Sequence, residues 1–81
     1  MYEAFLNLNQ KNLAQILKGH RKKAHISQQM LADMAGVSRT AIQRLEESVL
    51  KVQLDTLLKV MNILNITLEL SSPLLEEFKD E

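Results

Sequence analysis

The 81-residue chain contains no cysteine, so neither a disulfide nor a cysteine-ligated metal can supplement its core. It has no apolar run near the roughly 20 residues that are needed to span a bilayer. Residues 1–9 lack the basic segment and long apolar stretch of a secretory signal. These absences favour one small domain in a reducing compartment, so we expect a cytoplasmic protein that does not use a membrane.

The sequence also shows no pattern of a catalytic or metal-binding site. No nucleophile is paired with a base, and no glycine-rich loop is present to cradle a phosphate. His20 and His25 are five positions apart without neighbouring ligands, which indicates surface or turn residues rather than a metal site. We therefore predict no catalytic residue, no metal and no cofactor, and expect that the protein is not an enzyme.

The charges cancel overall but are unevenly spread. Residues 10–51 hold eight Lys and Arg against three Asp and Glu, whereas residues 52–81 hold two against six. A basic front half indicates an anionic partner at that end, although short proteins also acquire such splits by chance. The acidic end fits either a solubilising tail or a surface for a basic patch on a partner protein, and its residues are Glu76, Glu77, Asp80 and Glu81.

Hydrophobic residues recur at helical spacing in four stretches. We expect the first helix to follow Asn9 as its N-cap, and the second and third to follow Ser27 and Ser38. After a loop at residues 48–53, the fourth helix is predicted over residues 55–64. Its apolar stripe is expected to contain Leu54, Leu57, Leu58, Met61 and Leu64, widened by Val60 and Ile63. Three methionines are interpreted as core filler, namely Met30, Met34 and Met61.

After the fourth helix, apolar and polar residues alternate strictly over residues 66–71, which predicts a short β-strand. A short helix is expected at residues 74–79. Since no second strand is evident in the chain, the same strand of another copy would satisfy its backbone groups. The alternative is an extended tail packed on its own domain. The predicted dimer surface consists of Val60, Ile63, Leu64, Ile66, Leu68 and Leu70.

The most informative stretch, residues 28–46, has the spacing of a helix-turn-helix. Ala32 is small enough for two short helices to approach closely, and Gly36 supplies the left-handed turn between them. Ile42 and Leu45 would hold the third helix against the second, which leaves its other face free to enter a major groove. An ordinary helical hairpin with a solvated charged face would not explain so many matched positions.

The exposed face of the third helix is predicted to present side chains that recognise base edges. Arg39 and Arg44 offer a bidentate fork to guanine, and Thr40 offers both a hydroxyl and a methyl group. Gln28 and Ser38 begin helices, where side chain and backbone N–H together hold a phosphate. The complete predicted DNA-contacting set is Gln28, Ser38, Arg39, Thr40, Gln43, Arg44, Lys22, Lys23 and Lys51.

Residues 13–64 resemble the helix-turn-helix domain of the Cro/C1 (Xre) family of regulators. The matching positions are Gln28, Leu31-Ala32, residues 35–38, Ile42, Leu45-Glu46 and residues 54–57. The resemblance implies an all-α, lambda-repressor-like four-helix domain. It also implies base contacts at Arg39, Thr40 and Arg44, with Gln43 nearby and a phosphate at Gln28.

The chain departs from the family pattern in three places. Ala24-His25 occupies a turn that usually carries Gly or Asn, and Gln53 stands where Ser, Thr or Pro usually begins the last helix. Residues 47–50 replace a loop that often contains Gly. Glu46 and Glu47 put two negative charges near the DNA side, which puts the backbone contacts of this loop in doubt.

Four helices followed directly by a short hydrophobic strand resemble, more narrowly, the HipB-type antitoxins. That resemblance implies a homodimer on palindromic operator DNA, a HipA-like serine/threonine kinase toxin as partner, and autoregulation of the operon. We accordingly divide the chain into a DNA-binding domain (9–64) and a dimerisation strand with an acidic tail (65–81). Two alternatives stay open: a stand-alone phage-type or Xre repressor, and a protein-interaction module that does not bind DNA.

Overall fold

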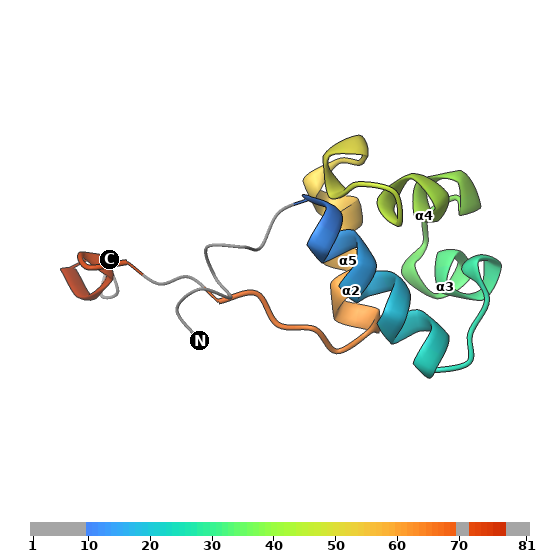
Figure 1. Ribbon diagram of the computed structural model, residues 1–81, viewed down its shortest axis with the longest axis horizontal. Helices are drawn as coiled ribbons and strands as arrows, with labels where there is room; N and C mark the ends of the chain where they lie inside the picture. The colour runs from blue at the N-terminus through green and yellow to red at the C-terminus, as the bar shows by residue number, and fades with distance from the viewer. Residues whose placement is uncertain (1–9, 70–71, 78–81) are drawn as a thin grey trace.

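The computed structural model describes residues 10–69 and 72–77, and within these residues the chain forms four α-helices and no strand. The helices are α2 (Gln10–Lys23), α3 (Gln28–Ala35), α4 (Arg39–Leu45) and α5 (Leu54–Ile63). One turn of 3₁₀-helix, η1 (Val49–Lys51), joins α4 to α5, and a second, η2 (Leu75–Glu77), comes later. Figure 1 shows the α-helices packed together and the chain after α5 running away from them. The predicted all-α helical domain is confirmed.

Serine caps begin both helices of the central pair. The Oγ of Ser27 accepts a hydrogen bond from the backbone N–H of Met30 at 3.0 Å. The Oγ of Ser38 accepts one from the N–H of Ala41, also at 3.0 Å. Such caps satisfy an N–H that has no partner inside the helix, and each contributes about 0.5–2 kcal/mol. Both predicted caps are confirmed.

The turn between α3 and α4 depends on Gly36, whose φ of 71° lies in the left-handed region. Its backbone N–H donates back to carbonyls of α3, and the N–H of Val37 donates to the carbonyl of Ala32 at 2.9 Å. These bonds close the end of α3 and reverse the chain into α4. Ala32 itself is fully buried. The predicted roles of Gly36 and Ala32 are therefore confirmed.

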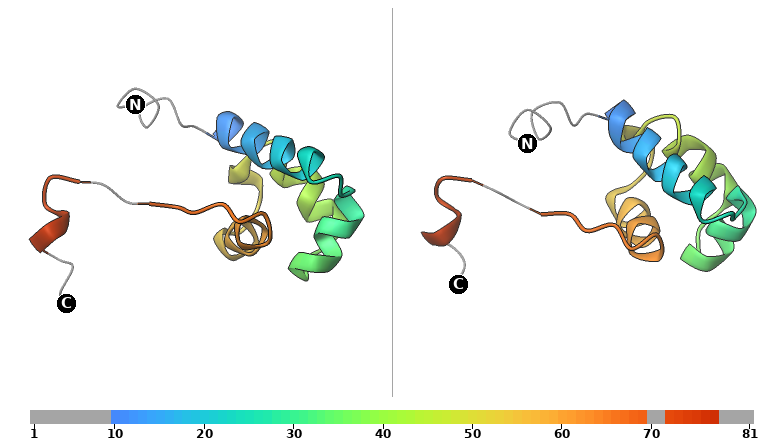
Figure 2. Two further views of the ribbon diagram at one scale, coloured as in Figure 1. Left: turned by 90° about the horizontal axis from the view of Figure 1, so that it is seen from below. Right: turned by 60° about the horizontal axis from the view of Figure 1, so that its bottom comes forward.

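The core lies where the four helices meet. Its members are Leu17 from α2, Leu31 and Ala32 from α3, Ile42 and Leu45 from α4, and Leu57, Val60 and Met61 from α5. Figure 2 looks nearly along α5, with α2, α3 and α4 all on one side of it. The packing of α3 against both α4 and α5 holds the helix pair rigidly on the rest of the domain.

Four predicted core positions are wrong. Met30 and Met34 are 49% and 55% exposed, and Leu54 and Leu58 are also exposed. Adjacent helical positions differ by 100°, so a small rotation moves a residue from the core to its margin. The buried side of α3 is centred on Leu31-Ala32, and that of α5 is centred on Leu57, Val60 and Met61, which leaves Leu54 and Leu58 at the exposed edge of the predicted stripe.

The ends of several elements also differ from expectation. The predicted loop at residues 48–53 contains η1, and α5 begins one residue earlier than predicted. Of the predicted helix at 74–79, the described residues up to 77 form the single turn η2, and residues 66–69 have no regular structure in the isolated chain. A strand needs a neighbour to form a hydrogen-bonded ladder, and the described part of one chain supplies none. Asn9, Leu70 and the end of the acidic tail lie outside the described residues.

Candidate nucleic-acid interface

Helix α4 presents one polar face to solvent and buries the other. Ile42 and Leu45 are completely buried, which fixes the rotation of the helix about its axis. Because of that rotation, four side chains of the predicted base-contacting set are exposed, namely Arg39, Thr40, Gln43 and Arg44. Guanidinium, hydroxyl and amide groups together provide both donors and acceptors for base edges.

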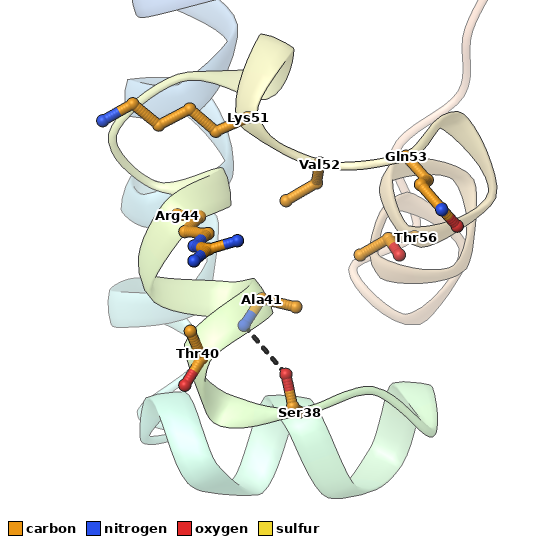
Figure 3. A pocket seen from close by; sticks show the side chains of 8 residues that line it. All are labelled: Ser38, Thr40, Ala41, Arg44, Lys51, Val52, Gln53 and Thr56. Carbon is orange, nitrogen blue, oxygen red and sulfur yellow. Dashed lines mark hydrogen bonds between the residues drawn. The ribbon is translucent and has the colours of Figure 1, made fainter.

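A hollow of about 210 Å³ lies between α4 and the start of α5 (Figure 3). Figure 3 shows Gln53 and Thr56 on the α5 side, across from Arg44 and Thr40. The hollow brings together four of the predicted DNA-contacting residues, which are Ser38, Thr40, Arg44 and Lys51. Ser38 uses its oxygen as a cap acceptor, so its hydroxyl proton remains to be donated.

Gln53 and Thr56 were not predicted as part of this site. Their side chains complete the wall of the hollow opposite α4. The sequence did contain one indication of their role, because Gln53 stands where Ser, Thr or Pro usually caps the last helix. In the structure Gln53 directly precedes α5, and its side chain forms no cap hydrogen bond. Its amide is therefore not committed to the helix end, and it provides a further donor for an anion held between α4 and α5.

A second hollow, of about 360 Å³, is lined by Lys18, Gln28, Gln43, Glu46 and Glu47. It brings Gln28, at the start of α3, together with Gln43 of α4. Lys18 of α2 adds a cation that the sequence analysis did not select. The two hollows share no residue, so the exposed face of α4 borders two separate polar sites.

Glu46 belongs to a buried polar network. Both of its oxygens accept hydrogen bonds from Arg21: Nε donates to Oε2 at 2.6 Å, and Nη2 donates to Oε1 at 3.1 Å. Arg21 Nη1 also donates to the carbonyl of Ile26 at 2.9 Å, and Gln28 Nε2 donates to Glu46 Oε1 at 3.1 Å. The network ties the end of α2 and the start of α3 to the residue that ends α4.

This network changes the interpretation of two residues. Glu46 is neutralised internally, so it does not add a bare negative charge to the DNA side. The side-chain nitrogen of Gln28 already donates to Glu46, so contact of Gln28 with a phosphate relies on its second amide hydrogen or its backbone N–H. Arg21 was not among the residues predicted from the sequence, because a partner 25 positions away leaves no local signal.

The two predicted lysines at the end of α2 point in different directions. Lys22 is about 40° from Lys18 around the helix, whereas Lys23 is about 140° from it. Lys22 therefore lies on the side of the second hollow. Lys23 instead lines a separate hollow of about 450 Å³ with Ile16, Gly19 and His20, apart from the other predicted residues.

Lys51 and Glu47 form an ion pair at the surface. Lys51 Nζ lies 2.6 Å from Glu47 Oε1, and both side chains are more than half exposed. The hydrogen bond from Lys51 lowers the pKa of Glu47, and the positive charge of Lys51 acts in the same direction. Arg44 adds a smaller effect of that sign, so Glu47 is an anion at neutral pH.

The residues predicted to form a dimer surface have unequal exposure. Val60 is fully buried in the core of its own chain, so it has no surface to offer a partner and its prediction is corrected. Ile63, Leu64 and Ile66 pack partly against that core. Leu68 is 53% exposed, whereas Leu70 lies outside the described residues.

Two short helices, a left-handed glycine turn and an exposed polar face on the second helix define a helix-turn-helix DNA-binding domain. A family model for this domain matches residues 17–70, about two thirds of the chain, and the chain belongs to this helix-turn-helix family, of the Cro/C1 (Xre) type. It is thus a DNA-binding transcription regulator from a family that is not enzymatic. No curated protein matches the chain. Among the described residues, no helix has the length and apolar character of a membrane span.

Proposed function

We propose that the protein is a homodimeric repressor that binds a palindromic operator through the exposed face of α4. The observation that carries this proposal is the position of that face between two hollows rich in polar groups. An α-helix with side chains is about 10–12 Å across, close to the width of the DNA major groove. With α4 in the groove, each flanking hollow would face one of the two phosphate backbones.

Roles follow from the chemistry of each side chain. Arg39 and Arg44 would donate to guanine, Gln43 would bond adenine, and the methyl group of Thr40 would meet thymine. Backbone contacts are assigned to residues around the hollows, namely Ser38, Lys51, Gln53 and Thr56 on one side and Lys18, Lys22 and Gln28 on the other. Phosphate contacts orient the domain, whereas base contacts select the sequence.

A mobility-shift titration with the chain's own upstream region tests this assignment. We expect Arg39→Ala and Arg44→Ala each to weaken operator binding by about 1–3 kcal/mol and to relax the choice of base at one position. Ala substitution of Lys23, which lines the separate hollow on α2, serves as the matched control for loss of a cation. Circular dichroism verifies folding, and unchanged operator binding in both arginine variants would overturn the proposal.

The dimer is supported by the chain after α5. After Ile66, which still packs against the core, the chain runs away from the helices, and Leu68 exposes an apolar side chain there. Pairing this segment with its copy would bury Leu68 and satisfy backbone groups on one edge of each chain. Two α4 helices about 34 Å apart would then bind successive major grooves on one side of a palindrome.

We further propose that the regulator is the antitoxin of a HipA-like serine/threonine kinase and represses its own operon. This narrower function is supported by the resemblance of the four helices and following segment to HipB-type antitoxins. A kinase-like reading frame beside the gene, whose product co-purifies with the chain, would support it. A regulator that binds its operator but has no such neighbour would instead be a stand-alone phage-type or Xre repressor. Co-purification with a larger partner at high salt, without DNA affinity, would identify an interaction module.

A further inference from the structure

We propose that Glu47 limits the strength of DNA backbone contacts by holding Lys51 in an ion pair across the end of α4. This inference rests on the proposed DNA binding and adds a residue that sets its affinity. Lys51 lines the hollow that contains Arg44, whereas Glu47 lines the hollow that contains Gln28. The pair therefore links the two sites that flank the exposed face of α4.

Lys51 differs from the other cations assigned to the interface. Within the described part of the chain, Arg39, Arg44 and Lys22 have no carboxylate within 4.0 Å, whereas Lys51 lies 2.6 Å from Glu47. Its positive charge is thus partly offset by Glu47 before DNA arrives. A cation that is paired in the free protein releases fewer counterions on binding, because it contributes little net charge to the phosphates.

The two consecutive glutamates have opposite environments. The side chain of Glu46 is only 4% exposed, and its carboxylate accepts hydrogen bonds from Arg21 and Gln28, so its charge is compensated inside the fold. The side chain of Glu47 is 62% exposed, and Lys51 donates to its Oε1. Of the two negative charges at the end of α4, Glu47 is the one that a phosphate would meet.

When DNA binds, Lys51 either stays paired with Glu47 or moves to a phosphate, and in both cases Glu47 reduces the affinity for DNA. If Lys51 stays with Glu47, a phosphate contact is not made. If Lys51 moves to a phosphate, Glu47 is left as an unpaired anion near the backbone, where like charges repel. The surface ion pair is weak and screened by salt, so Lys51 can leave Glu47 for a phosphate. The negative charge of Glu47 is then no longer offset by a nearby cation.

The neutral variant Glu47→Gln tests the proposal by removing the charge while keeping the shape. Fluorescence anisotropy would measure Kd for the upstream-region fragment and for an unrelated duplex of the same length, from about 50 to about 200 mM KCl. We expect E47Q to bind both duplexes roughly three- to ten-fold more tightly at the lowest salt, and its log–log salt slope to steepen by about 0.9. Both duplexes should respond alike, because phosphates carry no sequence information.

Asp55→Asn supplies the matched control. Asp55 and Lys59 form a second i, i+4 pair with nearly the same exposures, 63% and 52%, and their side chains line neither hollow. D55N changes the net charge as E47Q does but lies on α5. We expect its affinity and slope to stay close to those of the wild type. An equal gain in D55N would show an effect of net charge alone and would overturn the proposal.

A double-mutant cycle tests whether the effect of Glu47 on DNA binding depends on Lys51. In a Lys51→Met background, we expect Glu47→Gln to gain less than it does in the wild type, because it removes only the repulsion between Glu47 and the phosphates and no cation remains to be released. A full gain in that background, or unchanged or weaker binding by E47Q itself, would contradict the proposal. If the wild type binds DNA with a normal salt slope, the proposed DNA binding stands whatever the variants do. If the wild type binds no DNA at any salt concentration, both the proposed DNA binding and the proposed role of Glu47 are overturned. Thermal melts of each variant verify that the fold is intact.

Discussion

The guanidinium of Arg21 donates to both oxygens of Glu46, and each of these side chains exposes a tenth of its surface or less. At this burial, water does not solvate either charge well, so each ion depends on the other and on its hydrogen bonds. The carbonyl of Ile26 and the amide of Gln28 complete the network. A charge counted with the basic half of the sequence is thus used to join helices, not to attract DNA.

Glu46→Gln should therefore be strongly destabilising. The variant leaves the Arg21 cation buried without its counter-charge, and we expect the free energy of unfolding to fall by about 3–5 kcal/mol in urea titrations. The double variant Arg21→Met with Glu46→Leu should lose less, because no buried charge remains. A loss in E46Q of about 1 kcal/mol or less, typical of an exposed pair, would show that the network contributes little.

At the scale of elements, the two glycines provide opposite tests of helix geometry. Gly36 has φ 71° and ends α3, whereas Gly19 lies inside α2. A Cβ added at either position meets no other part of the fold within 4 Å, so neither substitution clashes with a neighbouring element. Any effect on stability must then come from backbone conformation, which differs between them.

Gly36→Ala should destabilise the domain by about 1–2 kcal/mol, because a left-handed conformation is costly for residues with a Cβ. Gly19→Ala should stabilise it by about 0.5–1 kcal/mol, because alanine favours the helix interior. Chemical denaturation of the two variants in parallel measures both changes. Gly36→Asn should cost less than Gly36→Ala, since asparagine adopts this region more readily. The same sign of change at both glycines would refute this explanation.

The elements also show which features could be predicted from sequence. The caps at Ser27 and Ser38 and the turn at Gly36 were predictable because each depends on a few neighbouring residues. The rotation of a helix about its axis was not, because tertiary packing selects the buried face. That is why Met30 and Leu54 were assigned to the core although they are exposed.

Of the candidate site, only the part that depends on neighbouring residues could be predicted from the sequence. The exposed residues of α4 follow from local spacing once a helix-turn-helix is assumed. Contributions from other elements do not: Gln53 reaches the first hollow from α5, and Lys18 reaches the second from α2. The pairing of Arg21 with Glu46 joins residues 25 positions apart, so only the folded chain brings it about.

At the scale of the whole molecule, the segment after α5 decides whether one copy or two bind DNA. Leu68 exposes 53% of its surface on a segment that leaves the helices, and a polar replacement there would not disturb the core. We expect Leu68→Asp to convert the protein from a dimer to a monomer in sedimentation equilibrium. An aspartate in a two-stranded ribbon would face its copy with like charge, which opposes pairing.

The DNA consequence follows from the symmetry of a dimer. A wild-type dimer should bind a full palindrome far more tightly than a half-site, because the second domain binds at high effective concentration. Leu68→Asp should lose that advantage of about 10²–10⁴-fold while keeping its half-site affinity, since α4 is unaltered. Met30→Asp, which places the same charge on a similarly exposed apolar residue of α3, is the control and should remain dimeric. Monomeric wild type, or a dimer that survives Leu68→Asp, would exclude this segment as the joint.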